Sequence, residues 1–216
     1  MSEEAEAFLT AIYAEPDDDG PRLVYSDWLE ERGQAERAEL IRQQCRLARG
    51  EILSEAEEEQ VGDLVEKFRE MWTAHLPQGE GVVWQFRRGF PEELEIEFAD
   101  FLDNYDAWYA LPRVRYLWLA GATSYYLRAF AAKTWNPKWV GFTFGEEPKP
   151  WLHEYGSDGS SGITALVRSP QAASLKELSL VGLVLGEASI RALCESPYLD
   201  GLHVLAVVKE SSTNQQ

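Results

Sequence analysis

The chain is poor in the residues that build most catalytic and metal centres. Its 216 residues include two cysteines, two methionines and three histidines, and the histidines, His75, His153 and His203, are scattered. No CxxC or HExxH spacing occurs, which argues against a zinc module of either kind. No Ser-His-Asp, Cys-His or paired-carboxylate arrangement can be recognised, although a site assembled only in three dimensions stays open. The sequence therefore predicts a protein that is not an enzyme and needs no metal or cofactor.

Long apolar runs are also absent. No run approaches the roughly 18 residues that a membrane helix requires, and the first residues, MSEEAEAF, contain neither the basic nor the apolar region of a signal peptide. We therefore expect a cytoplasmic protein without a membrane contact. Cys45 and Cys194 lie in predicted helices among apolar neighbours, so two buried free thiols are expected rather than a disulfide.

Basic residues are scarce relative to acidic ones. Lysines and arginines number 20 against 37 aspartates and glutamates, which gives a formal net charge of -17. Residues 1–70 hold 20 of the acidic residues but only 8 basic ones, a net charge of -12. Because phosphate binding depends on lysine and arginine, no direct contact with a nucleic-acid backbone is expected. The N-terminal acidity fits solvated helix faces, and it leaves open an acidic inhibitor or nucleic-acid mimic that binds a basic protein.

Apolar residues at helical spacing predict an all-α helical cap over residues 1–77. Four helices are expected: one that ends before Pro16, one over 21–33, one over 35–48, and one from the capping box at 54–57 to Pro77. Within this cap, the consecutive aspartates at 17–19 cannot all converge on one ion, so Asp18 or Asp19 is expected to cap the second helix. Asp27 is expected to be a partly buried carboxylate paired with an arginine across the helical hairpin.

A pattern of paired apolar residues recurs through the second half of the chain. The pairs are Leu94-x-Ile96, Leu117-x-Leu119, Phe142-x-Phe144, Leu178-x-Leu180 and Leu202-x-Val204. Their steps of 23, 25, 36 and 24 residues fit one period if the third step contains an insertion. Helical stretches lie between the pairs, so the pattern predicts a short β-α solenoid like a leucine-rich repeat over residues 78–208. The ninth repeat position is Ala122, Leu183 or Val207 instead of Asn or Cys, so the array is expected to be irregular.

The residues between the paired apolar positions are expected to point away from the core, because side chains alternate across a strand. The predicted partner-binding residues are Glu93, Glu95, Glu97, Tyr116, Trp118, Thr143, Glu177, Ser179 and His203. Aromatic residues contribute much of the energy at interface centres, and flanking acids select a basic partner. We therefore expect a protein-binding or scaffold module, whose partner and oligomeric state the sequence leaves open. The other tryptophans are expected to be packing residues.

Two segments are expected to lie outside the regular elements. Residues 145–162 are rich in proline, glycine and serine, which predicts an exposed loop. Whether this loop covers Tyr116 and Trp118 or leaves them exposed stays open. Residues 209–216 are polar and predict a frayed tail. The predicted fold class is α/β: an N-terminal helical cap followed by a short, irregular leucine-rich-repeat-like solenoid.

One stretch of the helical cap carries a family resemblance. Residues 16–33, PDDDGPRLVYSDWLEERG, and residues 37–44, RAELIRQQ, resemble the bacterial repeat-companion domain, whose pattern is similar to PDDDxPRLVYADWLEERGD followed by RAEFIRLQ. Gln34 stands where that pattern prefers aspartate, which weakens the expected cap of the third helix, and Ser26 replaces a usual alanine. The resemblance covers about residues 3–48 and implies a cytoplasmic, non-enzymatic module attached to a repeat array. It implies no established activity.

Overall fold

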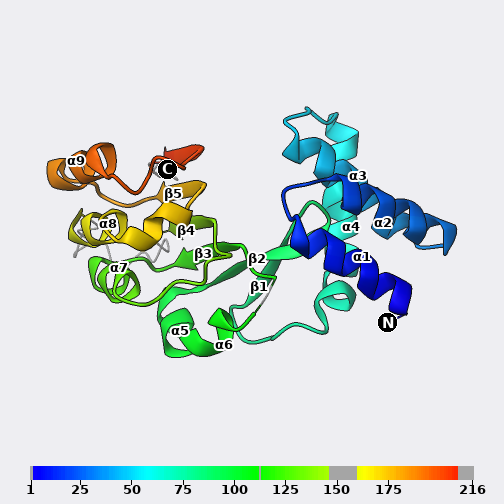
Figure 1. Cartoon of the computed structure of the whole chain (residues 1–216), viewed down its shortest axis with the longest axis horizontal. Coiled ribbons are helices and arrows are strands. Elements are labelled where there is room, and N and C mark those ends of the chain that lie inside the picture. The colour runs from blue at the N-terminus through cyan, green and yellow to red at the C-terminus, as the bar shows by residue number, and fades with distance from the viewer. Residues whose placement is uncertain (1, 112, 146–159, 209–216) are drawn as a thin grey trace, which may run out of the picture. The chain divides into compact units, whose positions relative to one another are not determined.

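The computed structural model describes residues 2–111, 113–145 and 160–208, and in this part of the chain the fold is mixed α/β (Figure 1). Helices occupy the N-terminal region, and a six-stranded, mostly parallel sheet follows. The chain forms two compact units. Unit 1 contains residues 1–79 and Trp84–Glu92, and unit 2 contains Glu80–Val83 and the described residues from Glu93 onward.

Unit 1 begins with four helices, as the apolar spacing predicts. They are α1 (Glu3–Ala14), α2 (Gly20–Glu31), α3 (Ala35–Ala48) and α4 (Glu55–Thr73). Local sequence explains where they start. At the start of α4, the Ser54 side chain accepts from the Glu57 amide while the Glu57 carboxylate accepts from the Ser54 amide, so the predicted capping box is present. Gln34 precedes α3 without a side-chain cap, as the loss of the usual aspartate leads one to expect.

A tight hairpin completes unit 1. Strands β1 (Val83–Arg87) and β2 (Phe90–Glu97) are joined by Arg88 and Gly89, with φ angles of 47° and 81°, and two-residue turns of this kind match the twist of paired strands. Gly89 lies against α3, where a Cβ would stand only 2.7 Å from the Cα of Ile41. Its amide donates to the side chain of Gln44 at 2.7 Å. The turn therefore requires glycine both for its backbone angle and for its close approach to the helix.

Helix α3 separates two apolar clusters of unit 1. The first contains Leu9, Ile12, Leu29, Ala38, Ile41, Cys45 and Phe90. The second contains Leu40, Leu64 and Phe86, with Val61, Val65, Phe68 and Trp72 packed against it. Arg37 also belongs to this region, and its guanidinium lies over the Trp72 ring at 4.5 Å. The clusters join α1, α2 and α4 to the hairpin through a single central helix.

A fully buried ion pair ties α2 to the hairpin. Nη2 of Arg22 lies 2.7 Å from Oε1 of Glu92, and the two side chains are 0% and 1% exposed. The same Nη2 donates to the carbonyl of Pro16 at 3.0 Å. The expected pairing of Asp27 with an arginine across the helical hairpin is confirmed, because Asp27 lies 2.8 Å from Arg42, but the expectation that its carboxylate is partly buried was wrong, because the side chain is 71% exposed. The buried acid is Glu92, which is 70 residues from Arg22 in the chain. A local sequence pattern cannot predict a pair with this separation.

We predict that Arg22→Met lowers the free energy of unfolding by about 3–5 kcal/mol, because it leaves the Glu92 carboxylate buried without its cation. Replacing both partners, Arg22→Met with Glu92→Leu, should recover most of this loss. Urea denaturation, monitored by circular dichroism, measures the free energy of unfolding of the single and the double variant. The control is Arg191→Met, which removes the exposed Arg191–Glu187 pair and should cost about 0.5 kcal/mol or less. Equal losses for Arg22→Met and Arg191→Met would contradict this role for the buried pair.

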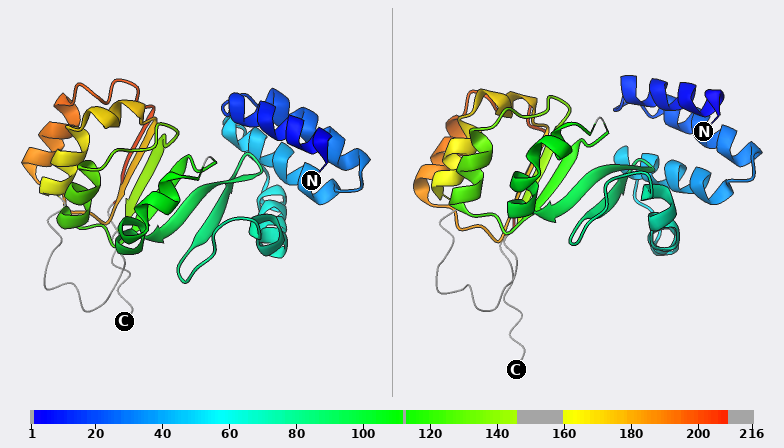
Figure 2. Two further views of the ribbon diagram at one scale, coloured as in Figure 1. Left: turned by 60° about the horizontal axis from the view of Figure 1, so that its bottom comes forward. Right: turned by 90° about the horizontal axis from the view of Figure 1, so that it is seen from below.

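Unit 2 contains the parallel part of the sheet and the remaining helices. The strands after β2 are β3 (Tyr116–Ala120), β4 (Gly141–Gly145), β5 (Glu177–Val181) and β6 (Val204–Val208). The helices are α5 (Phe98–Asp103), α6 (Tyr105–Tyr109), α7 (Ser124–Ala131), α8 (Ser160–Val167) and α9 (Glu187–Glu195), with a 3-10 helix at Pro170–Ser174. The strands pair in chain order, and each neighbouring pair from β2–β3 to β5–β6 is parallel. Helices α7, α8 and α9 lie side by side along one face of these strands (Figure 2).

The paired apolar residues form two rows across this sheet. Leu94, Leu117, Phe142 and Leu178 share one register level, and Ile96, Leu119, Phe144 and Leu180 share the next. All eight are at most 3% exposed. Four of the five predicted strand positions are therefore correct. The fifth was wrong by three residues, because Leu178 pairs with Leu205 and Leu180 with Val207.

The hydrogen bonds of the backbone explain why the last strand was predicted three residues too early. The amide of Leu202 donates to the carbonyl of Leu199 at 3.0 Å, so Leu202 still belongs to the turn before β6. The pairs Leu202-x-Val204 and Leu205-x-Val207 show the same alternation. Only the hydrogen bonding to β5 distinguishes them.

Aromatic residues fill the space between the rows and the helices. Phe130 stacks on Trp135 with ring centroids 5.0 Å apart, and Trp135 meets Phe142 edge-on at 5.1 Å. Trp84, Trp108, Trp135 and Trp139 are buried, as predicted for packing residues, and Trp72 stacks on Phe68. Trp151 lies outside the described residues.

No helix in the described ranges is long and apolar enough to span a membrane.

The two cysteines differ in environment. Cys45 is buried in unit 1, as predicted, but Cys194 is exposed on α9, so the expectation of two buried thiols was wrong for the second. Both are free thiols. Burial raises the pKa of the Cys45 thiol to about 12, so at neutral pH this group is an uncharged, poorly nucleophilic thiol.

We predict that one thiol per chain reacts rapidly with a disulfide reagent at mildly alkaline pH, and that the second reacts only after unfolding. Cys194 reacts first because it is exposed, whereas Cys45 is shielded and holds its proton. Absorbance of the released thiolate counts the groups. In the Cys194→Ser variant the rapid phase should disappear, and its persistence would show that Cys45 is accessible.

Candidate protein-binding face of the sheet

The strand register brings eight of the nine predicted binding residues onto one face. At one level Glu93, Tyr116, Gly141 and Glu177 lie in a row across β2 to β5, and at the next level Glu95, Trp118, Thr143 and Ser179 do the same. Glu97 follows on β2, opposite Ala120. These positions alternate with the buried core rows, so their side chains leave the sheet on the opposite side. We call the eight predicted residues of these strands, Glu93, Glu95, Glu97, Tyr116, Trp118, Thr143, Glu177 and Ser179, the Trp118 face.

The ninth predicted residue, His203, does not belong to this face. It precedes β6, and its amide donates to the carbonyl of Lys176 at 2.8 Å. The positions beside Glu177 and Ser179 are taken by Val204 and Ala206. The prediction of His203 was wrong because it rested on the three-residue slip of the last strand. If β6 had been placed correctly, the outward residues predicted for the last strand would have been Val204 and Ala206 instead of His203.

Trp118 is the exposed aromatic side chain of the face. It is 37% exposed, and the other described tryptophans are buried or only partly exposed. Its Nε1 lies 3.3 Å from the position that a Cβ on Gly145 would take. The indole therefore reaches across from β3 to the bare backbone of β4. The partly exposed ring offers a flat apolar surface beside that backbone.

Tyr116, the neighbouring aromatic residue, is buried. It is 8% exposed, and its Cδ1 lies only 2.3 Å from where a Cβ on Gly141 would stand. The tyrosine ring thus occupies the space that any larger residue at position 141 would need. Tyr116 is therefore buried and Trp118 is exposed, while most of the loop that was expected to cover them lies outside the described residues. Of the loop predicted at 145–162, Gly145 belongs to β4 and residues 160–162 belong to α8, and residues 146–159 lie outside the described residues.

The face is bordered by carboxylates. Glu93, Glu95, Glu97 and Glu177 are all partly exposed, and the Glu97 carboxylate reaches over the turn after β3, with Oε2 2.9 Å from the position of a Cβ on Gly121. Four carboxylates beside an indole favour a cationic ligand over an anionic one. Within the described residues no group of three or more histidine, cysteine or acidic side chains could hold a metal ion.

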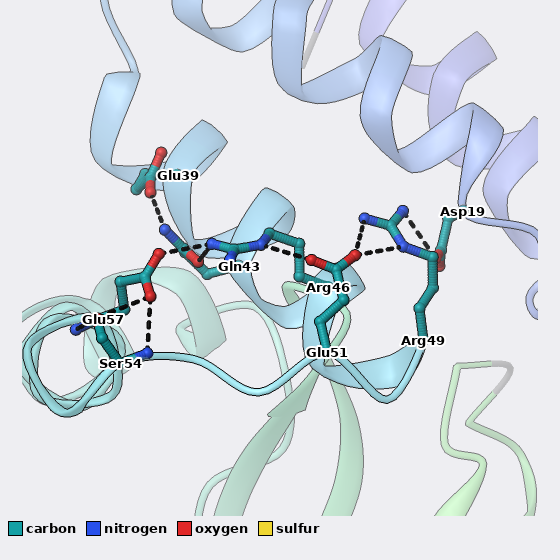
Figure 3. A network of polar contacts seen from close by, with 8 residues as sticks. All are labelled: Asp19, Glu39, Gln43, Arg46, Arg49, Glu51, Ser54 and Glu57. Carbon is teal, nitrogen blue, oxygen red and sulfur yellow. Dashed lines mark hydrogen bonds and ion pairs between the residues drawn. The ribbon is translucent and has the colours of Figure 1, made fainter.

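Many acidic groups of the N-terminal helices are engaged by arginines. Figure 3 shows Arg46 between Glu51 and Glu57, at 3.0 and 2.7 Å, and Arg49 between Glu51 and Asp19. Hydrogen bonds from Arg46 and from Ser54 lower the pKa of Glu57 to about 2. These carboxylates thus hold α2, α3 and α4 together, and their charges are compensated locally.

The aspartates at 17–19 act at the start of α2. Oδ1 of Asp18 accepts from the amide of Gly20, the first residue of α2, at 2.8 Å, whereas Asp19, the residue at the N-cap position, makes no side-chain cap bond. Asp19 forms ion pairs with Arg88 at 3.1 Å and Arg49 at 3.6 Å. Asp17 also lies 3.6 Å from Arg88, so Asp17 and Asp19 share that arginine, whereas Asp18 binds a backbone amide.

Comparison with protein-family models, with curated proteins and with solved structures found no match. The chemistry of the face therefore rests on its own residues. Thr143 and Ser179 offer hydroxyls, the glutamates offer carboxylates and Trp118 offers an apolar plane. Such a set suits binding, because hydrogen bonds, charge and one aromatic anchor converge on a flat surface.

We predict that Gly141→Ala lowers the free energy of unfolding by about 1–3 kcal/mol, because the new methyl group displaces the Tyr116 ring. Gly62→Ala is the control. Gly62 lies inside α4 with open space where a Cβ would stand, so alanine there should stabilise the protein by about 0.5–1 kcal/mol. Thermal and urea unfolding compare the two variants. A Gly141→Ala protein as stable as the parent would show that the tyrosine does not depend on the glycine.

Proposed function

We propose that this chain is a non-enzymatic protein-binding or scaffold module that recognises a protein partner through the Trp118 face. The observation that carries the proposal is the exposed Trp118, held against Gly145 and placed in register between Glu95 and Thr143. Tryptophan is enriched among the residues that dominate binding energy at interfaces. An aromatic ring has few rotatable bonds, so it loses little conformational entropy when a partner covers it.

The proposed partner presents a basic segment. Glutamates occupy three successive outward positions of β2, and Glu177 lies on the far side of the face on β5. The alternating outward positions along one strand lie about 7 Å apart, so a lysine- or arginine-containing segment can meet several carboxylates at once. Charge of this kind accelerates association and selects the partner, while the aromatic contact supplies most of the affinity.

We further propose that the sheet and helices of unit 2 are a short, irregular leucine-rich-repeat-like array, attached to a helical domain of the repeat-companion kind. Three observations support this. The strands follow chain order and are parallel, the apolar rows recur in register, and α7, α8 and α9 lie side by side (Figure 1). Arrays of this type present one strand face to macromolecules.

The alternative is an acidic inhibitor or nucleic-acid mimic that binds a basic protein through the N-terminal helices. We favour the Trp118 face because it presents the exposed indole of Trp118, whereas Asp19, Glu51 and Glu57 of the alternative surface form ion pairs within unit 1. The exposed acids of α4 that remain, such as Glu58 and Glu59, can be tested by reversal to lysine. Loss of partner binding in that variant, with binding retained in Trp118→Ala, would favour the alternative.

We predict that Trp118→Ala weakens binding of the partner by about 30-fold or more, the effect of losing about 2 kcal/mol at an interface centre. The partner is first identified by placing a photo-reactive phenylalanine at position 118 in the cell and analysing the cross-linked protein by mass spectrometry. The purified pair is then titrated by calorimetry at low and high salt, where binding should weaken as salt rises.

The matched control is Tyr125→Ala, which removes an exposed aromatic residue from α7, outside the Trp118 face. It should bind as the parent does, and a cross-linker at position 125 should capture nothing specific. If Trp118→Ala and Tyr125→Ala bind equally well, the proposed face is not the binding surface.

A further inference from the structure

The last strand of the sheet, β6, is an exposed apolar edge. Val204, Leu205, Val207 and Val208 are 47–55% exposed, although Leu205 and Val207 continue the two core rows of Leu178 and Leu180. In the described residues no strand lies beyond β6. Edge strands of this kind are normally blunted by charge, proline or a covering element. The sequence VLAVV of β6 contains neither a charge nor a proline.

The backbone of β6 presents two residues to the free edge. The Val204 amide donates to the Lys176 carbonyl at 3.0 Å, and the Val208 carbonyl accepts from the Gly182 amide at 2.9 Å. The N–H and C=O groups of one strand residue point to the same side, and successive residues alternate. Val204, Ala206 and Val208 therefore face β5, whereas Leu205 and Val207 direct their N–H and C=O groups outward.

From this geometry we propose that two copies of the chain associate through β6, paired antiparallel about a two-fold axis at Ala206. In this register Leu205 lies opposite Val207 of the second copy, and the two outward-facing residues exchange both of their hydrogen bonds. The two-fold axis repeats the exchange, so four bonds form. Ala206 then lies opposite Ala206 of the second copy in a pair without hydrogen bonds, where side chains approach most closely. Alanine is the small residue that this position needs.

Charge and symmetry identify a second copy as the occupant. The Trp118 face carries carboxylates that select a basic ligand, but β6 carries no charged side chain and so selects neither a basic nor an acidic one. Around Ala206 its sequence is nearly symmetric, with a branched apolar residue at each flanking position. Antiparallel pairing therefore places apolar residues against apolar residues on both sides of the sheet.

The pairing should respond to concentration and salt in a characteristic way. Four half-exposed side chains give an apolar strip much smaller than the ~800 Å² per partner of a standard interface, so the dimer should dissociate on dilution. The net charge of -17 makes two copies repel each other. Salt screens that repulsion and should tighten the dimer, whereas it should weaken the binding of a basic partner to the Trp118 face.

The test is sedimentation equilibrium of the full chain over a concentration series at low and high salt. We expect a monomer–dimer equilibrium that shifts toward the dimer as salt rises. Val207→Pro removes an outward N–H without touching the bonds to β5, and Ala206→Lys places two lysines against each other at the axis. Each should raise the dissociation constant of the dimer by about a hundredfold or more. Tyr125→Lys makes the same charge change on α7 and should leave the dimer intact.

Circular dichroism and urea unfolding test whether each variant folds. If either Val207→Pro or Ala206→Lys fails to fold, the result of the other variant tests the proposal. A dimer that survives the folded variants overturns the proposal, and so does a Tyr125→Lys protein that dissociates equally. A parent chain that stays monomeric at all concentrations also overturns it. In that case slow hydrogen exchange at the Leu205 and Val207 amides would mean that a segment of the same chain covers β6, and fast exchange would mean that the edge is bare.

Discussion

The in-register pairing of the parallel strands is the constraint on which unit 2 depends. Because every neighbouring pair from β2 to β5 aligns the same alternating positions, one set of residues forms the apolar rows and the other forms the Trp118 face. A shift of one residue in any strand would exchange the two sets. The core, the glutamates and the exposed indole are thus consequences of one hydrogen-bonding pattern. Buried aromatics such as Phe142 and Phe144 stabilise that pattern, because a one-residue shift would move them away from the helices to the opposite face.

Unit 1 is organised by charge to a greater extent. The Arg22–Glu92 pair is excluded from water, and its desolvation is offset by close geometry, by the bonds from Arg22 to the carbonyls of Pro16 and Arg88, and by the contact of its guanidinium with the Phe90 ring. Arg46 and Arg49 each bridge carboxylates from different segments, and Arg88 binds both Asp17 and Asp19 before α2. An acidic sequence can therefore form a compact helical unit, because its few arginines lie where the carboxylates converge. The same arrangement leaves less negative charge for a partner than the composition suggests.

Local signals in the sequence were sufficient for the helices and for most of the strands. The capping box at 54–57, the glycine after α2 and the alternation around Leu94 or Leu117 depend on neighbouring residues, so they can be recognised without the fold. Three features could not be. The Arg22–Glu92 pair joins residues that no local pattern connects, the burial of Tyr116 depends on Gly141 of another strand, and the start of β6 depends on hydrogen bonds that the Lys176 carbonyl accepts. The role of the Trp118 face in binding is a prediction, because alternation places a side chain outward without naming its ligand.

The two glycines of β4 couple the sequences of neighbouring strands. Gly141 leaves room for the Tyr116 ring, and Gly145 lies beneath the edge of the Trp118 indole. The outward surface of β4 is thus built largely from side chains that belong to β3. A descendant of this chain could enlarge position 141 only after position 116 had become smaller, and the two sites would change as a pair. The shape of the Trp118 face therefore depends on β3 and β4 together, because residues of one strand occupy space left by glycines of the other.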